Sequence, residues 1–233
     1  MQGKFVVTGC GRSGTTFTTH LFRQVGVDAR HEEFFPYIKR RWPGVFYDRK
    51  ADRHHLFGLD WGDYAAEIAW QAAPFLAWLH PSIPVVHQLR HPRRFVLSRI
   101  SKGMTHADLR NRYTRIKINN RGAEAVNEAA FADKVRYLAE FWVVWNDLVE
   151  KNARGSYMRL RVEDLDPAAF GKMLDHVGVT AAPEAIDAAF ATVPRDTNTR
   201  PPSGEAVDWA VLSGAARSRL EAACARYGYD PEG

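Results

Sequence analysis

The chain has 233 residues, 45% of them hydrophobic, which is enough to bury the core of one large domain. It contains no apolar run near 18 residues, and a strand is expected almost at the first residue, so we expect neither a membrane span nor a signal peptide. Two distant cysteines, Cys10 and Cys224, provide no disulfide or metal-binding pattern, which favours a cytoplasmic protein. The net charge of +5 favours an anionic ligand.

Predicted strands and helices alternate along the chain. In order, we expect a strand at 5–9, a helix at 15–26, a short strand at 27–34, loop and short helix at 36–60, a helix at 64–79, a strand at 83–90, a helix from Pro92, a long helix at 124–152, a strand at 156–161, and helices at 168–177, 183–191 and 211–226. This alternation predicts an α/β fold of three layers, with a mostly parallel central sheet flanked by helices, in a single domain spanning 1–233. Ligands of such sheets bind at the carboxyl ends of the strands.

A glycine-rich turn between the first strand and the first helix predicts a phosphate cradle. Gly9 and Gly14 keep the spacing of the Walker A motif, GxxxxGK[ST], but Thr15 stands where that motif has lysine, and the cation is Arg12 instead. The N–H groups at the start of a helix bind anions, and glycines let the preceding loop curl around them. We therefore expect an anion site that does not hold a triphosphate on magnesium. Its expected binding residues are Gly11, Arg12, Ser13, Gly14, Thr15 and Thr16.

A second candidate for anion binding lies in LRHPRRFVLSR, residues 89–99. Arg90 ends a predicted strand, and Ser98 follows eight residues later on the next helix. The two side chains are expected to converge on one phosphate, because arginine supplies a charged fork and serine a hydroxyl.

In these two motifs the chain resembles the sulfotransferases that use 3′-phosphoadenosine 5′-phosphosulfate (PAPS), particularly their carbohydrate and bacterial branches. GCGRSGTT (9–16) resembles their 5′-phosphosulfate loop, and Arg90, Pro92 and Ser98 match their 3′-phosphate motif. The resemblance implies a P-loop-like fold, PAPS as the donor, adenosine 3′,5′-bisphosphate (PAP) as the product, and no required metal. It also implies a small-molecule or glycan acceptor, and a late 3′-phosphate contact for which Arg200 is the candidate.

The acceptor hydroxyl or amine needs a base, and Glu32 is our first expectation. It follows the short second strand, which should place it at the mouth of the cleft that holds Arg12. A GHE-like step is common here in the branch that the chain resembles, although Arg30 stands in place of the glycine. His31 is the alternative base. The expected catalytic residues are therefore Arg12, Glu32 and His31.

Two other functions compete with sulfuryl transfer. A P-loop nucleotide kinase or hydrolase would share the loop, but Thr15 in place of lysine counts against it. A non-catalytic module for polyanions would explain the basic segment from Arg90 to Arg121, in which Asp108 is the single acid. Only Tyr113 interrupts residues 100–121 with an aromatic ring, and no nucleic-acid motif is present, so we do not expect a nucleic-acid partner.

Overall fold

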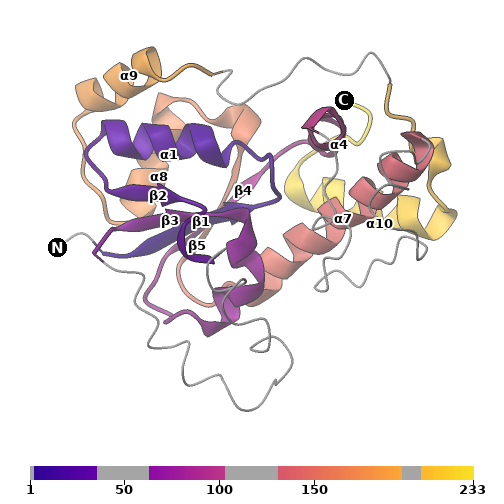
Figure 1. The fold of residues 1–233 in the computed structure, drawn as a ribbon, viewed down its shortest axis with the longest axis horizontal. Helices are drawn as coiled ribbons and strands as arrows, with labels where there is room; N and C mark the ends of the chain where they lie inside the picture. Colours follow the sequence, from indigo (N-terminus) through magenta and orange to yellow (C-terminus); the bar gives the residue numbers. More distant parts are fainter. Residues whose placement is uncertain (1–2, 36–62, 103–130, 196–205) are drawn as a thin grey trace. The chain divides into compact units, whose positions relative to one another are not determined.

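The computed structural model describes residues 3–35, 63–102, 131–195 and 206–233 (Figure 1). The chain divides into two compact units. The first comprises Met1–Leu89 and Leu148–Asn198, and the second comprises Arg90–Asp147 and Thr199–Gly233. The prediction of a single domain stays a prediction, and the two units are described separately below.

The first unit contains a five-stranded, all-parallel sheet. Its strands are β1 (Phe5–Gly9), β2 (Ala29–His31), β3 (Ala66–Ile68), β4 (Val85–Leu89) and β5 (Tyr157–Arg161), and their order across the sheet is β2-β3-β1-β4-β5. β1 is central, so the loop that follows it emerges from the middle of the carboxyl edge. Helices flank the sheet, and the predicted α/β class is confirmed.

Alternating residues of the strands bury a core against three helices. These are α1 (Thr15–Gln24), α8 (Pro167–His176) and α9 (Pro183–Thr192), which lie together over the sheet in Figure 1. Phe5 and Val7 of β1 face this core, and Phe22 of α1 contacts Phe5 and Phe170 at ring-centroid distances of 4.9 and 5.2 Å. A period of two along β1 and a helical stripe on α1 therefore fix the orientation of the loop between them.

The predicted α-helix at 64–79 is wrong over its first part, and over its second part the helix is of the 3₁₀ type. The segment instead forms β3, paired with both β1 and β2, and then the 3₁₀ helix η1 (Trp70–Trp78). Glu67 is the physical reason for the error, because a carboxylate between Ala66 and Ile68 hides the continuous apolar pattern of a buried strand. The second strand is also shorter than predicted, since β2 covers only three residues of 27–34.

The second unit is helical. It contains α4 (Pro92–Lys102), most of α7 (Phe131–Asn152), the 3₁₀ turn η3 (Trp209–Val211) and α10 (Gly214–Tyr227). The predicted start of a helix at Pro92 is confirmed, and so is the long amphipathic helix over its described part. Trp142 and Trp145 of its apolar stripe are almost completely buried. Among the helices that the structure describes, none is both long and apolar enough to cross a membrane.

Candidate functional site

The backbone of the glycine-rich loop is fixed by two close approaches. At Gly9, an added Cβ would lie 2.0 Å from the carbonyl oxygen of Gln88 on the neighbouring strand, so only glycine fits. At Gly14, an added Cβ would lie 2.6 Å from Cγ2 of Val162, and φ is +85°. Gly14 is the N-cap of α1, so this left-handed residue turns the chain directly into the helix. The two motif glycines therefore shape a tight strand-loop-helix junction.

Arg12 and Glu32 share an unusual backbone conformation. Within the described residues, they are the two non-glycine residues with positive φ, at +78° and +56°. Such a conformation costs of order 1 kcal/mol or more at a non-glycine residue, and it concentrates at functional sites. Both residues were singled out from the sequence for their chemistry. The strained backbone is an independent observation on the same two positions.

A chain of contacts joins the start of α1 to the end of β2. Thr15 Oγ1 lies 3.1 Å from His31 Nε2, and His31 Nε2 lies 3.9 Å from Glu32 Oε1. Gln71 Nε2 donates a hydrogen bond of 3.0 Å to Glu32 Oε2. The side chains of His31 and Glu32 remain 29% and 33% exposed, so a ligand can reach them. The structure thus brings both candidate bases to the helix that begins at the loop.

Three buried polar atoms surround the loop without a hydrogen-bond partner among the described residues. They are Thr8 Oγ1 at the end of β1, Ser13 Oγ in the loop and Nε2 of Gln88 on β4. The other side-chain atom of Gln88, Oε1, accepts from Thr18 Oγ1 of α1 at 3.0 Å. Unpartnered buried polar groups are rare in native proteins and are explained by bound ions, water or function. These three atoms are therefore available to form hydrogen bonds to a ligand or to water at the loop.

A buried carboxylate, Glu67, supports the turn after β2. Glu67 Oε1 accepts from the backbone N–H groups of Glu33 and Phe34 at 3.0 and 2.9 Å, and Oε2 accepts from Tyr64 Oη at 3.1 Å. Burial raises the pKa of Glu67 to about 7, although the hydrogen bonds favour the ionised form. Sequence reasoning missed this residue. The available clue was a single acid in the apolar run AAEIAW.

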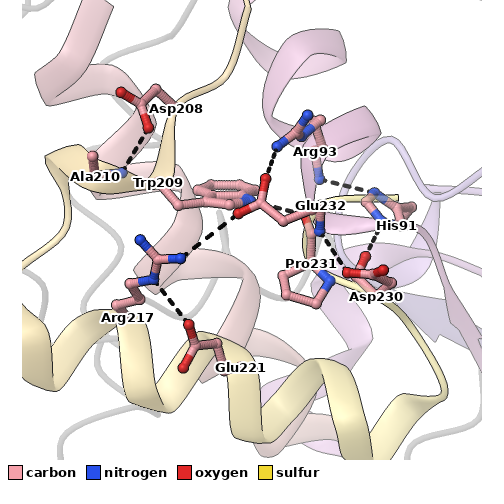
Figure 2. A network of polar contacts seen from close by, with 10 residues as sticks. All are labelled: His91, Arg93, Asp208, Trp209, Ala210, Arg217, Glu221, Asp230, Pro231 and Glu232. Carbon is pink, nitrogen blue, oxygen red and sulfur yellow. Dashed lines mark hydrogen bonds and ion pairs between the residues drawn. The ribbon is translucent and has the colours of Figure 1, made fainter.

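In the second unit, hydrogen bonds hold the backbone where the chain passes from Arg90 into α4. The carbonyl oxygen of Arg90 accepts from Trp142 Nε1 at 2.9 Å. Nδ1 of His91 accepts from the backbone N–H of Arg93 at 3.2 Å, so the His91 side chain caps α4. The other ring nitrogen, Nε2, donates to the carbonyl oxygen of Asp230 at 2.6 Å, an arrangement that requires neutral imidazole (Figure 2). Ser98 lies in the second turn of α4.

The C-terminal segment adds further contacts at the start of α4. The carboxylate of Glu232 forms an ion pair with Arg93, and its Oε1 lies 3.8 Å from Nη2 of Arg217 (Figure 2). Trp209 Nε1 donates a hydrogen bond of 2.8 Å to the carbonyl oxygen of Pro231. The backbone at the start of α4 is therefore held by contacts from α7 and from the end of the chain. Such support fixes the register of the helix that carries Ser98.

One predicted site residue, Arg200, lies outside the described residues. Most of 33–60 and 100–125, the segments expected to shape the acceptor pocket, also lies outside them. Of the residues that are described, Thr15, His31 and Glu32 are brought together, whereas Arg90 and Ser98 belong to the other unit.

Two comparisons bear on the family. No protein-family model matches the chain, and no curated protein matches it either. The resemblance to sulfotransferases therefore depends on the sequence motifs alone. In the described part of the chain, no group of three or more His, Cys, Asp or Glu side chains is arranged to hold a metal ion.

Proposed function

We propose that the protein is a sulfotransferase that moves a sulfuryl group from PAPS to an acceptor hydroxyl or amine. The observation that carries the proposal is the contact chain from Thr15 through His31 to Glu32. It places a carboxylate and an imidazole beside the helix start that the sequence marks as an anion site. An anion cradle next to a candidate base is the arrangement that transfer of a sulfuryl group from a phosphosulfate anhydride requires.

In this proposal the loop binds the 5′-phosphosulfate end of the donor. The N–H groups at the start of α1 and the Arg12 guanidinium stabilise negative charge on the departing phosphate oxygen. The left-handed backbone at Arg12 and Gly14 supports this role, because it curls the loop in front of the helix. No lysine of the Walker type is needed, since the donor carries no triphosphate.

Glu32 is the proposed base, and His31 is the alternative. The acceptor oxygen or nitrogen forms a bond to sulfur while the bond from sulfur to the 5′-phosphate oxygen breaks. Glu32 takes the proton that the acceptor loses, and PAP leaves with the electron pair of the broken bond. Gln71 holds one carboxylate oxygen of Glu32 and His31 lies near the other, which leaves the group oriented but accessible.

Arg90 and Ser98 are proposed to bind the 3′-phosphate of the donor. The capped and braced start of α4 supports this assignment, because a charged fork gives specificity only when its backbone is held in place. This contact would separate PAPS and PAP from nucleotides that lack a 3′-phosphate.

Calorimetry with PAP and with ATP tests the proposal without knowledge of the acceptor. PAP should bind with a Kd on the order of micromolar, equivalent to about 8 kcal/mol, and ATP should bind far more weakly. A kinase or hydrolase would instead prefer ATP with magnesium. Equal affinity for both nucleotides would favour a general polyanion module.

A further inference from the structure

We propose that Glu67 is a positioning residue, whose buried carboxylate holds the turn that carries His31 and Glu32. Its importance for sulfuryl transfer rests on the proposed function, because that function makes Glu32 the base. The contacts of the carboxylate with the turn do not depend on that assignment.

Glu67 is held on a rigid part of the sheet. Glu67 lies in the middle of β3, which is paired on both sides, opposite Val6 of β1 and Arg30 of β2. The residue has no exposed surface. A side chain anchored in an interior strand has few alternative positions, so the two carboxylate oxygens define fixed points below the end of β2.

Two hydrogen-bond donors to Glu67 come from the turn that follows Glu32. Oε1 binds two successive backbone N–H groups, those of Glu33 and Phe34, directly after Glu32. Residues 34 and 35 are helical, so these donors belong to a turn whose first N–H groups need an external acceptor. The hydroxyl of Tyr64 binds Oε2 and fixes the orientation of the carboxylate.

The backbone of Glu32 is strained. A glutamate at φ +56° persists only when its surroundings impose that conformation. The backbone N–H of Glu32 is held by the carbonyl oxygen of Ile68 at 3.3 Å, and the next two N–H groups are held by Glu67. Residues of β3 therefore accept hydrogen bonds from three successive backbone amides of the turn, and Glu67 accepts two of these three bonds. A side chain with an acceptor oxygen is needed there, because an apolar side chain offers those amides no acceptor.

The test compares Glu67→Leu with Glu67→Gln in the full-length protein, measured by NMR. Leucine removes both acceptors, whereas glutamine keeps an oxygen for the two N–H groups. Loss of bonds to a charged group predicts that the amides of Glu33 and Phe34 exchange with solvent at least about tenfold faster in Glu67→Leu. They should stay within about threefold of wild type in Glu67→Gln, since its amide oxygen still accepts. The His31 ring resonances should move in the leucine variant alone.

PAP binding and PAPS breakdown supply the functional measurement. Calorimetry should give a PAP affinity within about twofold of wild type for both variants, because neither touches the loop. Release of sulfate from PAPS, with water as the acceptor, should slow at least about tenfold in Glu67→Leu and recover in Glu67→Gln, since a displaced base loses its reach to the proton. Loss of kcat without loss of donor affinity distinguishes positioning from general stabilisation.

A folded Glu67→Leu protein with wild-type exchange and wild-type His31 resonances would overturn the proposal. If that variant does not fold, the wild type and Glu67→Gln decide. Exchange of the Glu33 and Phe34 amides of the wild type at the rate of an unstructured peptide would overturn the proposal, and protection of both amides in the wild type and in Glu67→Gln would support it. Failure of PAP to bind wild type would instead refute the proposed function, while a response of the two amides to Glu67 would leave the structural role intact.

Discussion

Replacing Glu67 with glutamine should remove a specific pH dependence from the stability of the protein. Burial raises the pKa of this carboxyl from 4.5 to about 7 on folding. A group shifted in this direction contributes stability that is fully present below pH 4.5 and is lost as the pH rises to about 7, because the folded state binds the proton more tightly. Linkage gives a loss of about 2–3 kcal/mol between pH 5 and pH 8 for such a shift. Glutamine is neutral throughout that range, so the variant should lack this loss.

The assay is urea unfolding of the wild type and of Glu67→Gln at pH 5, 6, 7 and 8. All other titrating groups are shared, so their effects cancel in the difference between the two proteins. The variant should gain stability relative to wild type as the pH rises, by about 2–3 kcal/mol over the full range. A difference that stays constant from pH 5 to pH 8 would refute the reasoning, because it would mean that the Glu67 carboxyl titrates equally in both states.

Four further substitutions test the loop, the 3′-phosphate contact and the base. Gly9→Ala should destabilise the protein by about 1–3 kcal/mol in urea unfolding, because the new Cβ meets the carbonyl oxygen of Gln88 at 2.0 Å, and unchanged stability would contradict this. Arg90→Ala should weaken PAP by about 1.5–3 kcal/mol and adenosine 5′-phosphosulfate much less in calorimetry, whereas equal losses would assign Arg90 to the fold. Glu32→Gln should lower turnover of labelled PAPS by about 10²–10⁴ and leave PAP affinity unchanged, on an acceptor found by screening sugars, lipids and phenols. A large loss in His31→Ala together with normal turnover in Glu32→Gln would make His31 the base.

The parts of the fold that follow local rules were predictable from the sequence. The first strand, the glycine turn and the helix after it are each marked by a short-range pattern, and so are Pro92 at the start of α4 and the apolar stripe of α7. The third strand was not predictable in this way. Its buried glutamate is satisfied by N–H groups 33 and 34 residues earlier in the chain, and no local pattern encodes such a distant partner.

In the candidate site, too, the features set by local sequence were predictable and those set by distant contacts were not. The glycine-rich loop follows from one contiguous motif, and Gly9 and Gly14 lie where close approaches require glycine. The contact between Thr15 and His31 depends on β2 and α1 meeting at one edge of the sheet, which the alternation of elements suggested only in outline. The hydrogen bond from His91 to Asp230 joins residues 139 apart, and the sequence gives no sign of it.

The measurement that tests the central claim most directly is calorimetric titration of the wild-type protein with PAP and, separately, with ATP and magnesium. The account predicts a Kd for PAP on the order of micromolar and binding of ATP that is weaker by at least about tenfold, or about 1.4 kcal/mol, since ATP has no 3′-phosphate. Adenosine 5′-phosphosulfate should fall between them, because it engages the loop alone. Equal affinities for PAP and ATP, or preference for ATP with magnesium, would contradict the assignment of PAPS as the donor.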